Sequence, residues 1–151
     1  MISVRQLSYR ELNSLPGFQT IADEYALESS IPEMAPATED LPLYIRLNDA
    51  GLLRVLAAFD DETLIGYMCF TVSPSPHYSK KIASTESFFV KPDYRKTGAG
   101  LSLLKMAELI ATELGAACFL VTAPTGSKLC DVMEKIKGYR ETNRVFFRSL
   151  L

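Results

Sequence analysis

Histidine and cysteine, which often build metal and nucleophilic sites, are scarce in this chain of 151 residues. His77 is the only histidine, so a Ser-His-Asp hydrolase would have to be built around that one side chain. The three cysteines are odd in number, widely spaced and set in apolar surroundings: Cys69, Cys118 and Cys130. This pattern argues against zinc or any other metal and favours reduced thiols in a cytoplasmic protein, with Cys69 and Cys118 as core residues of strands.

Long apolar runs are absent as well. No stretch approaches the ~18 consecutive apolar residues of a membrane span, and the first six residues lack the build of a signal peptide. Hydrophobic residues make up 48% of the sequence and charged residues 23%, the proportions of a globular protein. With no repeat, low-complexity tract or linker, we expect one domain over residues 1–151, in the cytoplasm and without a membrane partner.

Each half of the chain is poor in charge of one sign. Residues 1–75 carry 4 basic and 11 acidic side chains, whereas residues 76–151 carry 12 basic and 7 acidic. Two opposite fields can attract two ligands of opposite sign, although surface charge that happened to segregate is an equally open interpretation. The basic half has no dense Arg/Lys run with interleaved aromatic residues, so nucleic acid is not expected as a partner.

Apolar periodicity and turn residues predict the order of the elements. Strands are expected at residues 4–7, 52–59, 64–72, 82–90, 117–121 and 139–150. Helices are expected at residues 11–27, 43–50, from Gly100 to Gly115, and 127–137. This order predicts an α/β (α+β) layer fold, with an antiparallel front half and a crossover helix after the fourth strand.

The most informative segment, residues 86–101, joins the fourth strand to the long helix and reads ESFFVKPDYRKTGAGL. Glycines at 98 and 100 allow close approach to the backbone, and the amides at a helix N-terminus point at an anion. The Gly-Lys-Ser/Thr end of a Walker A loop is missing, and so is the third glycine of a dinucleotide-binding turn. The segment therefore predicts an anion-binding turn of another kind.

With its flanks, Val-x-Pro followed by Arg-x-x-Gly-x-Gly, the turn resembles the acetyl-coenzyme A site of the GNAT superfamily of N-acetyltransferases. The element order matches that fold over essentially the whole chain, and Gly138-Tyr139-Arg140-Glu141-Thr142 resembles the start of the family's last strand. The resemblance implies a GNAT-like acyl-coenzyme A N-acyltransferase fold, with a mixed central sheet of about six strands flanked by about four helices. It also implies acetyl-coenzyme A or coenzyme A as the cofactor.

Carried over position by position, the resemblance assigns the residues that hold the cofactor. The backbone amides from Lys96 to Leu101 would bind the pyrophosphate, and a strand splayed from its neighbour would line the pantetheine arm. The residues assigned in this way are Phe88, Phe89, Val90, Arg95, Lys96, Thr97, Gly98, Ala99, Gly100 and Leu101. Ser127 stands near the family's adenine-side polar position, and a helix N-cap is its equally open alternative.

Glu86 is the natural candidate for the catalytic base. An alkylamine has a pKa near ~10.4, so a base or an ordered water path must take its proton before it can be acetylated. Members of the family often carry a carboxylate near this position. Strand alternation is expected to place Glu86 on the same face as Val90, four residues further on. An exposed or hydrogen-bonded strand residue is the alternative interpretation of Glu86.

One position departs from the family's pattern. Met133 stands where many members carry a tyrosine that protonates the leaving sulfur, and a thioether cannot donate a proton. Tyr139, Cys130 or a water could replace it, or the thiolate leaves unassisted; we take Tyr139 as the second catalytic candidate. The departure keeps two alternatives to an N-acetyltransferase open: a coenzyme A-binding sensor with weak or no turnover, and an interaction domain that retains only the fold.

The acceptor is expected to be a primary amine, on a small molecule or at a protein lysine or N-terminus. The first half of the chain, with its negative charge, favours a cationic amine, and we assign Glu24 and Glu28 to its binding. His77 and Tyr78, in the loop before the Glu86 strand, are further candidates for binding the acceptor or moving a proton. A homo-oligomer is compatible with the sequence.

Overall fold

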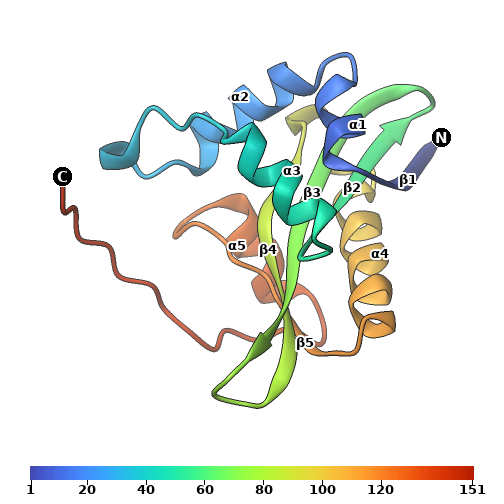
Figure 1. Cartoon of the computed structure of the whole chain (residues 1–151). Coiled ribbons are helices and arrows are strands. Elements are labelled where there is room, and N and C mark those ends of the chain that lie inside the picture. The colour runs from blue at the N-terminus through green and yellow to red at the C-terminus, as the bar shows by residue number, and fades with distance from the viewer.

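The computed structural model describes residues 1–151, and a five-stranded sheet runs through it in the order β1-β2-β3-β4-β5 (Figure 1). The strands are β1 (Ile2–Leu7), β2 (Leu53–Asp60), β3 (Thr63–Ser75), β4 (Lys80–Val90) and β5 (Ala116–Leu120). The helices are α1 (Tyr9–Ser14), α2 (Phe18–Ser29), α3 (Leu41–Asp49), α4 (Ala99–Glu113) and α5 (Lys128–Lys135), with 3-10 turns at Pro32–Met34 and Pro92–Tyr94. No helix combines the length and apolar character that a membrane crossing requires.

The two faces of the sheet carry separate cores. Strands β1 to β4 pair antiparallel in succession, and β5 joins β4 in parallel after the crossover through α4. Helix α4 covers one face with Leu103, Leu104 and Ala107, in a cluster of 14 buried residues. Helices α1 and α2 cover the other face, where Leu12 and Phe18 belong to a cluster of 13 buried residues. The predicted fold class, the antiparallel front half and the crossover helix are confirmed.

Strands β4 and β5 part half-way along. Their pairing runs from Lys81 opposite Ala116 to Ser84 opposite Leu120 and goes no further, although β4 continues to Val90. The last link between them is the Thr122 amide, which donates to Thr85 Oγ1 at 3.0 Å. The second half of β4 therefore has an edge that β5 leaves uncovered, which is the splay that the resemblance implied.

A β-bulge lies at Glu86, on this second half of β4. Cys69 of β3 faces Ser87 and Phe70 faces Thr85, so Glu86 is an extra residue without a partner. The extra residue reverses the alternation: Val90 packs in the α4 core, whereas the Glu86 side chain reaches α3 on the other face. The prediction that strand alternation places Glu86 and Val90 on one face was therefore wrong.

Two predicted elements differ in the structure. The helix expected at residues 11–27 is two helices, because Gly17 takes a left-handed φ of 84° after Pro16 and starts α2 anew. The strand expected at residues 139–150 does not form, so the sheet has five strands rather than six. Strand β5 is consequently an edge strand, and Cys118, expected in the core, is exposed, whereas Cys69 is buried as expected.

Candidate active site

The turn between β4 and α4 presents backbone amides with nothing to bind. Gly98 precedes α4 with a φ of 86°, a conformation that favours glycine, and no side chain caps the helix. The amides of Gly98, Gly100 and Leu101 donate to no acceptor, and that of Ala99 has only a long bond of 3.4 Å to Thr97 Oγ1. Because such a row of amides at a positive helix end suits an anion, the turn fits the phosphates of coenzyme A.

Gly100 lies directly over the uncovered end of β4. A Cβ built on it would stand 3.7 Å from Val90 Cγ2 and 3.9 Å from Phe88 Cζ, which is ordinary contact. Both side chains lie on the α4 face of the sheet, whereas Phe89 is buried on the opposite face with α2. Of the three predicted pantetheine-lining residues, Phe88 and Val90 thus adjoin the amide turn, and Phe89 faces away from it.

The Arg95 side chain connects the turn to α2 and does not extend into solvent. Its Nε donates to the Val90 carbonyl at 2.9 Å, and its Nη2 donates to Glu28 Oε2 at 2.6 Å. The structure thus brings together a residue assigned to the donor and one assigned to the acceptor. The neighbouring Lys96 and Thr97 are exposed, and the Thr97 hydroxyl donates to the Tyr94 carbonyl. Two of the five N–H donors of Arg95 are therefore engaged within the protein.

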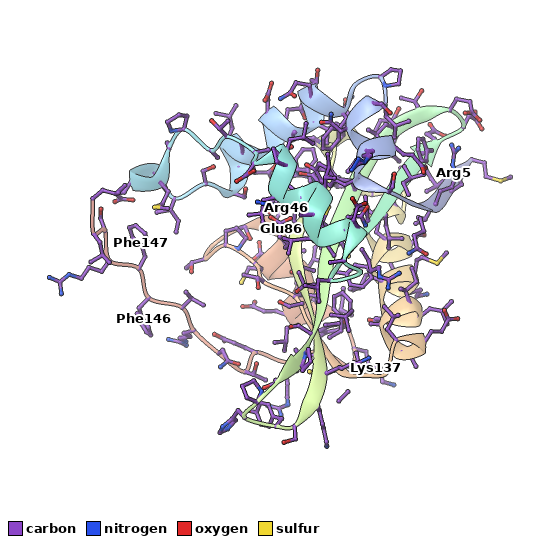
Figure 2. All side chains as sticks on the ribbon, viewed as in Figure 1. Arg5, Arg46, Glu86, Lys137, Phe146 and Phe147 are labelled. Carbon is purple, nitrogen blue, oxygen red and sulfur yellow. The ribbon has the colours of Figure 1, made fainter.

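Glu86 is held in place by a tyrosine from α3. The Tyr44 hydroxyl donates to Glu86 Oε1 at 2.5 Å, and the Tyr44 ring stacks on Tyr9 with centroids 4.5 Å apart. The Tyr9 hydroxyl in turn donates to Glu39 Oε2 at 2.7 Å. Figure 2 shows Glu86 on β4 behind α3. One oxygen of the carboxylate is thereby fixed, and Oε2 remains for another ligand.

The surroundings of Glu86 raise the pKa of its carboxyl above the ordinary value. Desolvation is the main cause, because the carboxyl sits among the rings and helices of this face even though its tip is open to solvent, and the charge of Glu39 adds to it. The Tyr44 hydroxyl opposes the shift, since it donates to the ionised form. A carboxyl with a raised pKa is a better proton acceptor than an ordinary glutamate.

Aromatic hydroxyls surround this carboxylate. Tyr25 of α2 and Tyr67 of β3 lie edge to face with centroids 6.0 Å apart, and burial raises the pKa of both, with Glu86 adding to the effect. Tyr44 and Glu39 come from a segment whose sequence, residues 39–44, carries no catalytic motif. Sequence reasoning counted Glu39 only among the acidic side chains that favour a cationic acceptor, and it missed Tyr44 as a part of the site.

A hollow of about 650 Å³ opens beside this cluster. Its lining comes from α2 and from the end of β4 with the turn that follows: Glu24, Leu27, Glu28, Phe89, Lys91, Pro92 and Asp93. The predicted acceptor residues Glu24 and Glu28 thus share one cavity, with a charge dominated by carboxylates. Phe89 in its wall also contacts Tyr25, which connects the hollow to the aromatic side chains around Glu86.

The other predicted site residues lie elsewhere. The Tyr139 hydroxyl donates to Glu108 Oε1 of α4 at 2.5 Å, on the face of the sheet opposite Glu86. Met133 packs against the same α4 core. The Ser127 hydroxyl caps α5 by accepting from the Cys130 amide at 3.2 Å, the alternative that its position allowed.

His77 and Tyr78 occupy the exposed tip of the β3–β4 hairpin. From the start of β4, Glu86 is six residues away, which is roughly 20 Å of strand. The two rings contact each other edge to face with centroids 4.6 Å apart and touch no other predicted site residue. The structure does not bring them to Glu86.

The chain is similar to known acetyltransferases. The sequence profile of the acetyltransferase (GNAT) family matches residues 18–139. An aminoglycoside N(6')-acetyltransferase type 1 of Acinetobacter baumannii is 29% identical over 104 residues, which are 67% of this chain and 71% of that protein.

Solved structures share the fold over almost the full length. A ribosomal-protein-alanine N-acetyltransferase from Brucella melitensis biovar Abortus 2308 has a TM-score of 0.75 at 19% identity, with 99% of this chain and 100% of that chain covered. AAC(6')-Iy in complex with the bisubstrate analog CoA-S-monomethyl-acetylneamine has a TM-score of 0.74 at 18% identity, with 99% and 97% covered.

The parallel strands β4 and β5 separate beside helix α4, which begins after Gly98 without a side-chain cap. Together with the comparisons, this arrangement defines an acyl-coenzyme A-dependent N-acyltransferase. The chain belongs to the acetyltransferase (GNAT) family. It is an N-acetyltransferase, and its acetyl donor is acetyl-coenzyme A.

Proposed function

We propose that the enzyme transfers the acetyl group directly to a primary amine of a cationic acceptor, with Glu86 as the base. The observation that carries this proposal is the placement of Glu86 on a bulge of β4, where β5 has left the strand and Tyr44 fixes one carboxylate oxygen. Acetyl-coenzyme A, when bound, supplies the activated acetyl thioester.

The donor is held by the amides of Gly98, Gly100 and Leu101, with Phe88 and Val90 under its arm. Along β4, Glu86 lies four residues or roughly 13 Å before Val90, the residue that adjoins the turn at Gly100. Backbone N–H groups on the uncovered edge of β4 can donate to an oxygen that becomes negative during the reaction. The turn amides, the two side chains and these N–H groups together orient the donor toward Glu86.

Glu86 Oε2 takes the proton from the acceptor's ammonium, because an amine can act as a nucleophile only when it is neutral. Tyr44 keeps the carboxylate aimed at this proton through Oε1. Met133, at the position of the family's tyrosine, has no proton to give to the leaving sulfur. Tyr139, the candidate to replace it, donates its hydroxyl proton to Glu108. The Cys130 thiol, the remaining candidate, donates to Glu134 Oε1 at 3.8 Å. We therefore assign the sulfur's proton to solvent, and we do not place Tyr139 in the catalytic machinery.

The acceptor enters over the hollow beside α2. Glu24 and Asp93 are carboxylates in its lining that make no ion pair, and Glu39 and Glu86 lie on the same face of the sheet. The curated relatives are named as acetyltransferases of aminoglycosides, which are polycationic amines, and this supports the same charge preference here. A small polycationic amine is therefore the acceptor that we favour.

This proposal predicts the order of preference among amines. In a competition between cationic and anionic primary amines, the cationic amines are acetylated faster, and their advantage shrinks as salt is raised from low to moderate concentration, because salt screens the carboxylates. Release of the coenzyme A thiol measures the rates. A preference for anionic amines, or a cationic preference that salt leaves unchanged, contradicts the acceptor site.

A second prediction concerns Tyr44 and the pH dependence of the reaction. The Tyr44→Phe variant loses the hydroxyl that favours the ionised form of Glu86, so the pKa of Glu86 rises further above its ordinary value. Since the base works unprotonated, the acidic limb of the pH–rate profile moves to higher pH. Besides Tyr44, the groups that act on Glu86 or respond to its charge are Ser87, Tyr25, Tyr67, Cys69 and Glu39, and none of them is altered.

The matched control is Tyr9→Phe. It removes the hydroxyl of the other ring in the stack, which serves Glu39 rather than Glu86. Its acidic limb stays at the wild-type pH. An equal displacement in both variants shows that the stack acts only through stability, and no displacement in Tyr44→Phe removes Tyr44 from the site.

A further inference from the structure

The ion pair between Glu28 of α2 and Arg95 is the most sheltered in the structure. Its two atoms, Glu28 Oε2 and Arg95 Nη2, lie 2.6 Å apart, and this is the shortest of the ion pairs. The Arg95 side chain is 25% exposed, whereas every partner in the other pairs is at least 38% exposed. Since exposed pairs contribute little, this pair has the greatest capacity to fix the direction of a side chain.

The Arg95 guanidinium lies on the edge of β4 that β5 leaves uncovered. The Lys91 amide donates to the Ile65 carbonyl of β3 at 2.8 Å. The N–H and C=O of one trans peptide point in opposite directions, so the Val90 carbonyl, in the same peptide as the Lys91 amide, points away from β3. Arg95 Nε donates to that carbonyl at 2.9 Å. The guanidinium therefore stands on the edge along which we place the donor's arm.

The guanidinium still has N–H groups to offer to a ligand. Its Nε and one N–H of its Nη2 are engaged by Val90 and Glu28, and the N–H groups of Nη1 have no acceptor in the protein. The turn that follows Arg95 holds the free backbone amides of Gly98, Gly100 and Leu101. An arginine with free donors next to free amides at a helix start is suited to a phosphate.

We propose that Glu28 is a positioning residue for the acetyl donor: it holds the Arg95 guanidinium at the uncovered edge of β4, where the free N–H groups bind a phosphate of coenzyme A. The inference rests on the proposed placement of the donor at the turn. Glu28 then serves the donor, although it lines the hollow proposed for the acceptor. Glu24, one helical turn earlier on α2 and without an ion pair, is left to the acceptor.

The proposal predicts an effect opposite in sign to that of charge alone. Coenzyme A is an anion, so removal of a nearby carboxylate strengthens its binding if only the electrostatic field matters. In Glu28→Ala, however, Arg95 loses the partner that directs it, and we expect coenzyme A to bind about three- to tenfold more weakly. Calorimetric titration of the full chain with coenzyme A measures the change. Unchanged or tighter binding overturns the proposal.

The matched control is Asp23→Ala. It removes an exposed carboxylate of the same helix that accepts from Gln19 and has no contact with Arg95. We expect its affinity for coenzyme A to equal that of the wild type or to exceed it slightly. An equal weakening in Asp23→Ala and Glu28→Ala shows that any charge lost from α2 has this effect, and it overturns the positioning role.

A donor without phosphates distinguishes positioning from a general effect on α2. S-acetylpantetheine carries the thioester and the arm, but it gives Arg95 no phosphate to bind. At saturating amine, Glu28→Ala therefore lowers kcat/KM for acetyl-coenzyme A and leaves kcat/KM for S-acetylpantetheine unchanged. A fall for both donors shows that Glu28 acts through the structure of α2 and contradicts the proposal.

A double-mutant cycle tests whether Glu28 acts through Arg95. In an Arg95→Gln background, Glu28→Ala causes no further loss of coenzyme A affinity, because the side chain that it positions is gone. A full additional loss overturns the proposal. The placement of the donor is tested separately by Gly100→Glu. If Gly100→Glu weakens coenzyme A binding and Glu28→Ala does not, only the inference about Glu28 fails; if Gly100→Glu binds as the wild type does, the placement fails and this inference with it.

Discussion

Replacement of Glu86 by glutamine lowers turnover by about 10²–10⁴-fold and leaves the affinity for coenzyme A nearly unchanged. The fall has the size that loss of a general base typically causes. Glutamine has the same shape, and its side-chain oxygen still accepts the Tyr44 hydroxyl, so the bulge and the stacked rings remain. Steady-state thiol release measures the turnover, and calorimetry measures the affinity for coenzyme A.

The control for this variant is Glu39→Gln. Glu39 also accepts a hydroxyl from a stacked tyrosine and lies on the same face of the sheet, but it is not on β4. We expect its turnover at saturating acceptor to stay within a few-fold of the wild type. Equal losses of turnover in both variants mean that the reaction depends only on the negative charge of this face and not on a base at Glu86. A loss of coenzyme A affinity in Glu86→Gln assigns Glu86 a structural role.

Replacement of Gly100 by glutamate weakens coenzyme A binding at least tenfold, which is about 1.4 kcal/mol. The new carboxylate stands beside amides that have no partner of their own and competes with the phosphates for them. It also adds negative charge where the donor is anionic. Calorimetric titration with coenzyme A measures the effect without any need for turnover.

The Gly100→Ala variant tests whether the charge of the glutamate or its added bulk weakens coenzyme A binding. A Cβ at this position meets Val90 and Phe88 at ordinary contact distances, and alanine favours the first turn of a helix. This variant binds coenzyme A within a few-fold of the wild type. If the glutamate variant also binds as the wild type does, the phosphates lie elsewhere; if both variants fail equally, close packing rather than anion binding explains the glycine.

Local signals in the sequence were sufficient for much of the fold. The hairpin of β2 and β3 follows from two apolar runs and an acidic turn, and the stripe through Leu103 and Ala107 placed α4 against the sheet. The turn that we propose for the donor was equally readable as a turn before a helix, because glycines, a helix start and a preceding strand are all consecutive in the chain. Each of these features depends on neighbours within a few residues.

The parts that could not be predicted depend on distant partners. Tyr44 lies 42 residues from Glu86, and Glu28 lies 67 residues from Arg95, so neither pair leaves a trace in local spacing. The bulge is likewise set by the pairing of β4 with β3 and not by the β4 sequence alone. Residues 139–150 have the composition of a strand, but composition does not say which sheet edge a strand will join.

In the proposed function, the bulge also lets one strand serve two substrates from opposite sides. Phe88 and Val90 point to the α4 face under the donor turn, and Glu86, a few residues away, points to the face of α2 and α3. Each molecule can therefore arrive, or leave, without displacing the other. The direct transfer that we propose needs both substrates at this site at once, so we expect double-reciprocal plots to converge and no acetylated enzyme to form.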